Sequence, residues 1–254
     1  MAEELRDRAI VLGVVDYGEK DRIVTLLTRE GGKLGAFARG ARASKKRFAG
    51  ALSPFTLLSV RLQPRRGELF HLASCVVEEA FLGLRDSLEA ISLAGYAAEL
   101  CRELCKEREP HPLLFDRLRA HLAVLASEPP RPEDRLAFEL GAIGEAGLMP
   151  RLDACARCGG EVDGPRVPFS PGEGGLLCGA CATRSAGETP KLSAAALDLL
   201  RRLQPGSADA VREPVSSYGD QALRESRLAI RVYLRHILGK ELRSLSVLSQ
   251  LGLE

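Results

Sequence analysis

The first eighty residues alternate short apolar runs with turn residues. The runs are rich in β-branched and other apolar side chains, and glycine- or proline-containing turns separate them. This pattern predicts short strands. The predicted strands cover residues 9–15, 23–28, 34–38, 55–62 and 69–73. Five short strands are typical of a small barrel of the OB type.

From about residue 77 the apolar positions recur every three or four residues, which is the period of a helix. Prolines and glycines interrupt this pattern and mark helix ends. Ser193 directly precedes one apolar segment and is a suitable N-cap. The predicted helices cover residues 88–109, 114–125, about 133–147, 194–203 and 220–238.

Four of the seven cysteines form two Cys-x-x-Cys pairs. Nineteen residues separate the pair Cys155 and Cys158 from the pair Cys178 and Cys181. Two residues between paired cysteines let both sulfurs reach one ion, and four thiolates close a tetrahedron around Zn²⁺. None of the four histidines is near the pairs in the sequence, so we expect one structural zinc ion per chain. A catalytic metal and a degenerate or redox-active pair are the alternatives.

The other cysteines, Cys75, Cys101 and Cys105, are interpreted as small buried hydrophobic side chains. Between residues 153 and 189 glycine is frequent and no period is visible, as in an element held by a metal instead of a core. We therefore expect an α+β chain with an N-terminal five-stranded OB-fold barrel, then an α-helical domain with an inserted four-cysteine zinc knuckle. The expected boundaries are 1–80 for the barrel, 81–150 and 190–254 for the helical domain, and 151–189 for the knuckle.

Charge is distributed unevenly along the chain. Residues 1–80 carry a net charge of +4 and the remainder −2, and no acidic residue occurs between Gly31 and Gly67. A stretch of one sign attracts polyanions, and nucleic acid is the commonest polyanion in a cytosol. The basic residues of this stretch, our candidates for nucleic-acid contact, are Lys33, Arg39, Arg42, Lys45, Lys46, Arg47, Arg61, Arg65 and Arg66. The alternative is a merely solvated charge run.

Aromatic side chains in this region offer a base-stacking surface, although each is equally suited to the barrel core. They are Phe37, Phe48, Phe55 and Phe70. The chain has no tryptophan. We therefore expect an affinity that is mostly electrostatic, falls steeply with salt and depends little on base sequence.

A second basic stripe lies on the predicted C-terminal helix. Arg224, Arg227, Arg231 and Arg235 are spaced by three, four and four residues, which places them on one helix face. This face is either solvated and salt-bridged or a second surface for DNA or an acidic partner.

Motifs of common enzymes are absent from the sequence. There is no P-loop, no Gly-x-Ser-x-Gly elbow and no His-Glu-x-x-His. The opening residues are too charged for a secretory signal, and no apolar run approaches the ~20 residues that span a bilayer. The sequence therefore favours a cytoplasmic, non-enzymatic protein.

Several motifs together resemble the RecO family of bacterial recombination mediators. They occur in the family's order along nearly the whole chain, at residues 9–12, 17–28, 31–33, 38–42, 147–153, 174–177 and 238–244. Some members of that family lack the zinc cysteines, whereas this chain has all four.

The resemblance implies an OB-fold, a helical domain and a zinc element that act on DNA without catalysis. It implies binding to single- and double-stranded DNA, annealing of complementary strands, and action with RecR to load RecA on strands coated by single-strand binding protein. It also implies a docking pocket for the C-terminal tail of single-strand binding protein in the helical region, and a cytoplasmic, nucleoid-associated location.

Two other classes remain open from the residues alone. One is a zinc-containing adaptor in transcription or RNA handling, which an RNA preference would favour. The other is a metal-dependent nuclease, which would need several acids converging on Mg²⁺.

Overall fold

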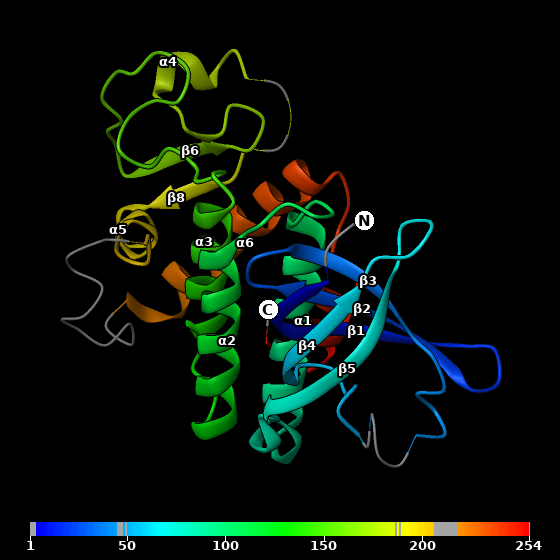
Figure 1. Cartoon of the computed structure of the whole chain (residues 1–254). Coiled ribbons are helices and arrows are strands. Elements are labelled where there is room, and N and C mark those ends of the chain that lie inside the picture. The colour runs from blue at the N-terminus through cyan, green and yellow to red at the C-terminus, as the bar shows by residue number, and fades with distance from the viewer. Residues whose placement is uncertain are drawn as a thin grey trace. The chain divides into compact units, whose positions relative to one another are not determined.

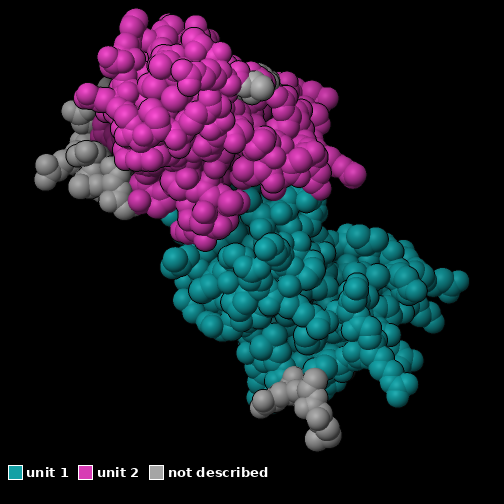
Figure 2. Space-filling view, turned by 90° about the horizontal axis from the view of Figure 1, so that it is seen from above, with its two compact units in different colours: residues 1–130 teal, residues 131–254 magenta. Residues whose placement is uncertain are grey.

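A computed structural model of the chain describes residues 4–44, 48, 50–185, 187, 189–205 and 218–253 (Figure 1). The chain forms two compact units, residues 1–130 and residues 131–254 (Figure 2). Strands give way to helices near residue 80, as the change of period predicts, but the first two long helices belong to the same unit as the barrel.

Unit 1 contains a closed barrel of five strands in the order β1-β2-β3-β5-β4. The pair β3–β5 is parallel and the other pairs are antiparallel. The strands are β1 (Leu5–Tyr17), β2 (Asp21–Thr28), β3 (Gly32–Ala38), β4 (Leu57–Gln63) and β5 (Phe70–Glu79). The predicted α+β fold class, an OB-like barrel followed by helices, is confirmed.

Side chains alternate between the two faces of the barrel strands. Val24, Leu26 and Ala36 point into the barrel core. Ile10, Leu27 and Leu57 are paired across neighbouring strands and are also buried, but they lie outside that core. Because helices of unit 1 contact β1 and β2, we assign this second buried row to the packing of helices on the barrel.

These helices are η1 (Leu82–Asp86), α1 (Leu88–Leu104) and α2 (Pro112–Ser127). The Ser87 hydroxyl accepts a hydrogen bond from the N–H of Ala90 and so caps α1. The guanidinium of Arg29, directly after β2, donates to both carboxylate oxygens of Asp116 on α2, at 3.2 and 2.9 Å. This pair ties α2 to the barrel and lowers the pKa of Asp116.

The prediction of one helix over residues 88–109 is wrong at its C-terminal end. α1 stops at Leu104, and the following loop pairs with the start of β3 through a bridge between Lys33 and Glu107. The approach is so close that a Cβ atom on Gly32 would lie 2.1 Å from the carbonyl oxygen of Glu109. Pairing with the barrel therefore ends a helix that local periodicity alone would continue.

Unit 2 combines helices with a small sheet. Its elements are α3 (Asp134–Glu145), β6 (Arg166–Ser170), β7 (Gly175–Leu176), α4 (Gly179–Ala182), β8 (Lys191–Ser193), α5 (Ala194–Arg202), α6 (Gly219–Leu238) and α7 (Ser244–Gln250). The sheet, in the order β7-β6-β8, has α4 on one side and α5 and α6 on the other (Figure 1). The sequence predicted no sheet here, because strands of two to five residues show no period.

The predicted N-cap of unit 2, Ser193, is present. The hydroxyl of Ser193 accepts a hydrogen bond from the N–H of Ala196 at the start of α5. Gly239 adopts a left-handed conformation, with φ 69°, and ends α6. Among the helices that the structure describes, none is both long and apolar enough to cross a membrane.

Candidate metal centre and nucleic-acid interface

The two Cys-x-x-Cys pairs converge in unit 2. The four sulfur atoms of Cys155, Cys158, Cys178 and Cys181 all lie within 4.8 Å of one another. The sulfurs of Cys158 and Cys178 are 3.8 Å apart. Zn–S bonds of about 2.3 Å in a tetrahedron place sulfurs about 3.8 Å apart, so this donor set fits a single thiophilic ion such as Zn²⁺.

Short backbone hydrogen bonds turn each pair back on itself. The N–H of Cys155 donates to the carbonyl of Gly160, and the N–H of Gly159 donates back to the carbonyl of Cys155, both at 2.8 Å. Cys178 precedes α4, and the N–H groups of Cys181 and Ala182 donate to its carbonyl. Each turn therefore brings the two sulfurs of its pair close to those of the other pair.

Gly175 of β7 lets the backbone just before the first cysteine pair pack closely against this strand. Gly175 lies beside Arg151, whose N–H donates to Gly174 and whose carbonyl accepts from Leu176. A Cβ atom on Gly175 would lie 2.3 Å from the carbonyl oxygen of Arg151. The close approach of the two backbones therefore requires glycine at this position.

The side chain of Arg157 links the two cysteine pairs, a contact that the sequence did not predict. Arg157 lies between Cys155 and Cys158, donates to Glu173 at 2.6 Å and reaches the carbonyl of Cys181 at 3.3 Å. Sequence alone offered no signal for this contact, because Arg157 and Glu173 are sixteen residues apart in a loop without period.

The cysteines differ in their protonation preference. Burial acts to raise the pKa of the Cys155 thiol, but backbone N–H groups of Cys178 and Cys158 donate to its sulfur and leave the pKa well below its ordinary value. Hydrogen bonding to Cys178, together with burial, raises the pKa of Cys181. A site that already favours one thiolate is prepared for a cation.

The remaining cysteines lie in unit 1. Cys101 is buried on α1 and Cys105 is buried directly after it, as interpreted, and Cys75 is half-buried on β5. Burial raises the pKa of Cys105 to about 11. These thiols pack as small apolar groups.

The fold brings acids to several of the basic residues of the acid-free segment. Arg42 lies 3.4 Å from Asp16, Arg61 lies 3.8 Å from Glu4, and Lys33 lies 3.3 Å from Glu107. The Lys33 ammonium also donates to the carbonyl of Arg102 at 2.8 Å, and its side chain is only 14% exposed. Counting charges along the chain therefore overestimates the cationic surface.

The basic residues are also spread along the barrel. Lys33 and Arg39 lie at opposite ends of β3, about 20 Å apart at ~3.3 Å per residue. Arg39, Arg65 and Arg66 are exposed. Lys45, Lys46 and Arg47 lie outside the residues that the structure describes.

Of the four candidate phenylalanines, Phe48 lies in the barrel core and Phe37 lies on the outside. The Arg65 guanidinium carbon lies 5.1 Å from the centre of the Phe37 ring, and the Tyr17 ring meets Phe37 edge-on at 5.8 Å. Phe70 packs against the core and lies beneath Arg108. The structure thus gathers a cation and two rings at the end of the β1–β2 hairpin.

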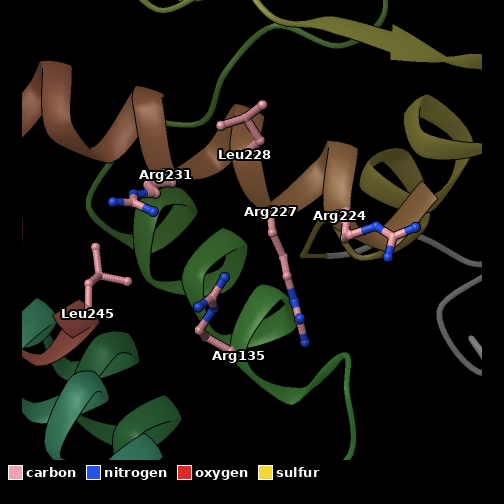
Figure 3. A pocket seen from close by; sticks show the side chains of 6 residues that line it. All are labelled: Arg135, Arg224, Arg227, Leu228, Arg231 and Leu245. Carbon is pink, nitrogen blue, oxygen red and sulfur yellow. The ribbon is translucent and has the colours of Figure 1, made fainter. Parts of the chain in front are cut away.

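The arginine stripe of α6 lines a pocket in unit 2 (Figure 3). Arg224, Arg227 and Arg231 contribute to a cavity of about 240 Å³, together with Arg135 of α3 and the leucines Leu228 and Leu245. Arg227 extends towards α3, and Arg135 points back towards α6 (Figure 3). Arg235 is not among the lining residues.

Acids compensate part of this positive charge. Arg135 and Glu139 form a buried ion pair at 3.4 Å, and Arg231 and Arg235 lie 3.2 and 3.9 Å from Glu241. Burial and the neighbouring charge of Arg135 nevertheless lower the pKa of Arg227. The pocket therefore favours an anion, and its leucines favour an apolar group beside it.

Two family profiles cover most of the chain. The family described as "Recombination protein O N terminal" matches residues 1–81, and "Recombination protein O C terminal" matches residues 85–246. Many relatives of this chain carry the name "DNA repair protein RecO". The relative from Anaeromyxobacter dehalogenans (strain 2CP-C) is 52% identical over 96% of this chain and 95% of its own length.

The relative from Myxococcus xanthus is 44% identical over 99% of this chain and 100% of its own length, and that from Geobacter metallireducens is 37% identical over 98% of both. These identities extend through both units. With a barrel followed by helices and a cysteine cluster already seen in the structure, the chain belongs to the RecO family of DNA repair proteins.

Proposed function

We propose that this chain is a non-enzymatic mediator of recombinational repair. It binds single- and double-stranded DNA, anneals complementary strands, and acts with RecR to load RecA on strands coated by single-strand binding protein. The observation that carries this proposal is the pairing of family membership with an OB-like barrel on which exposed Arg65 lies over Phe37 beside the exposed ring of Tyr17.

Annealing is a suitable task for such a surface. Two strands repel each other, and a cationic surface lowers that repulsion while holding each backbone weakly enough for register to be searched. No bond is made or broken. The residues proposed for backbone contact are those that the sequence singled out around the barrel, including Arg39, Arg42, Arg65 and Arg66; Lys33 contributes to the barrel's own structure.

An annealing assay without ATP tests this surface. The double variant Arg65→Glu/Arg66→Glu should anneal complementary oligonucleotides about tenfold more slowly, or worse, because two phosphate contacts become repulsive. The matched control is Arg85→Glu/Lys106→Glu, which changes the net charge equally at exposed positions of unit 1 outside the barrel strands. Equal annealing rates in both double variants would contradict the proposed surface. A preference of the wild-type protein for RNA would favour an adaptor role instead.

The arginine pocket of unit 2 is the proposed docking site for the C-terminal tail of single-strand binding protein. Its support is chemical: guanidinium groups pair with carboxylates, and the leucines accept an apolar side chain next to the terminal carboxylate. The lowered pKa of Arg227 marks a positive charge that an anionic ligand would stabilise.

Peptide binding measures this contact. Arg227→Ala should weaken binding of a labelled tail peptide by about tenfold or more, whereas Arg235→Ala, a change on the same helix outside the pocket, should leave affinity within about twofold. A peptide with an amidated C-terminus should bind wild type weakly. Equal affinities of the two variants would show that the peptide does not dock in this pocket.

We propose that Cys155, Cys158, Cys178 and Cys181 hold one structural zinc ion. Four thiolates leave no open position, so the ion would contribute folding free energy and no catalysis. Elemental analysis should find about one zinc per chain. Cys158→Ser should lose the metal and melt at a lower temperature, and freshly purified wild type without zinc would contradict the assignment.

A further inference from the structure

The outer face of the barrel carries an apolar row that ends in an exposed tyrosine. Strand register places Val15 opposite Ile23, and Ile23 opposite Phe37. The neighbours of Phe37 on its own strand, Ala36 and Ala38, point into the core, so Phe37 points outward. Val15 is 66% exposed, which shows that solvent reaches this row.

Tyr17 stands at the end of this row. Its side chain is 57% exposed, and its ring meets Phe37 edge-on, with an interplanar angle of 82°. A T-shaped contact fixes the orientation of the tyrosine ring and leaves at least one of its faces free of Phe37. The Arg65 guanidinium covers Phe37 instead, so Tyr17 offers the more accessible π-face.

Two turns hold Tyr17 in place. Asp21 accepts a hydrogen bond from the N–H of Gly40 at 2.6 Å, and the N–H of Arg42 donates to the carbonyl of Lys20 at 3.0 Å. The Arg42 side chain donates to Gly18, the residue after Tyr17. The ring is therefore presented by a braced hairpin, which lowers the entropic cost of using it.

Three arginines contact residues next to the Tyr17 ring: its partner ring Phe37 and its chain neighbour Asp16. Arg65 lies on Phe37, and Arg22 and Arg42 both reach the carboxylate of Asp16, at 3.0 and 3.4 Å. A phosphate would compete with Asp16 for these two arginines. Stacking surface and phosphate contacts thus lie side by side, as single-strand binding requires.

We propose that Tyr17 is a base-stacking residue that gives this surface its preference for single-stranded DNA. This inference rests on the proposed function and goes beyond it. Phe37 positions the tyrosine ring, and the surrounding arginines contact the flanking phosphates. A base in a duplex hides both faces in the helical stack, so only an unpaired base stacks on Tyr17.

The test compares Tyr17→Leu and Tyr17→Phe with Val76→Ala, a control that trims another exposed apolar side chain of the barrel. Affinities for oligo-dT and for a hairpin duplex are measured by anisotropy at several salt concentrations. Tyr17→Leu should bind oligo-dT roughly five- to a hundredfold more weakly. Its duplex affinity, and its slope of log affinity against log salt, should stay unchanged. Tyr17→Phe and Val76→Ala should match wild type.

Fluorescence gives a second readout, because the chain has four tyrosines and no tryptophan. Oligo-dT should quench part of the tyrosine emission of wild type but not of Tyr17→Phe, although both bind. Undiminished oligo-dT affinity in Tyr17→Leu, or an equal loss on single strands and duplex, would overturn the inference. Absence of all DNA binding by wild type would instead refute the proposed function as well.

Discussion

Single residues show why charge counted along a sequence is an incomplete guide to a surface. Nine basic residues without an intervening acid predict a strong cationic patch, yet Asp16, Glu4 and Glu107 reach that segment from other strands and loops. The cysteine spacing is the opposite case. Its geometry is nearly local, so the sequence predicted which four sulfurs converge but not the glycine and arginine that hold them together.

Gly175 provides a prediction at this scale. Gly175→Ala would force a Cβ atom against the carbonyl of Arg151, so the knuckle must shift. We expect a loss of about 1–3 kcal/mol in the free energy of unfolding and weaker metal retention. The control Gly179→Ala has open space around its new methyl group and should melt close to wild type. Thermal melting with zinc analysis measures both, and equal stability of the two variants would contradict this packing.

At the scale of elements, the spacing of apolar residues along the chain predicted the long helices but did not predict the short strands of unit 2. Helices α1, α2, α3, α5 and α6 lie where the period of about 3.6 predicts them. Strands β6, β7 and β8 are too short to show a period of two. The loop after α1 was misassigned because pairing with β3 decides its conformation, and no residue within that loop indicates the distant partner.

Glu225 links three of these elements and makes unit 2 sensitive to acid. On α6, it accepts from the N–H of Ser193 at 2.8 Å and lies 3.0 Å from Arg166 of β6. Burial acts to raise its pKa, but the hydrogen bonds from Ser193 and Gln221 and the charge of Arg166 together outweigh burial and bring the pKa to about 2. The folded state therefore gains stability above the unfolded pKa of about 4.3, and loses it as pH falls towards 2.

Glu225→Gln should reduce that acid sensitivity. At pH 7 the variant should lose about 1–3 kcal/mol of unfolding free energy, because a charge-assisted contact is removed. At pH 2.5 its stability should approach that of wild type. Urea unfolding at both pH values measures the difference, and a variant that is equally destabilised at pH 7 and pH 2.5 would argue against the assigned ionisation.

At the scale of the whole molecule, the two units divide the proposed work. The cationic barrel surface belongs to unit 1, whereas the cysteine cluster and the arginine pocket belong to unit 2. Cys158→Ser should therefore lower the melting temperature of the chain while leaving the salt dependence of oligonucleotide binding unchanged below that temperature. A changed salt slope in this variant would show that the metal centre takes part in DNA contact.

The central claim is that exposed cations of the barrel hold phosphate backbones by electrostatic attraction. The most direct measurement is wild-type affinity for a single-stranded oligonucleotide as a function of salt. Log affinity should fall linearly with log salt, by about 0.7 for each phosphate contact, and Arg65→Ala and Arg66→Ala should each reduce the slope by about 0.7. No binding in dilute buffer, or an affinity that salt does not change, would contradict the account.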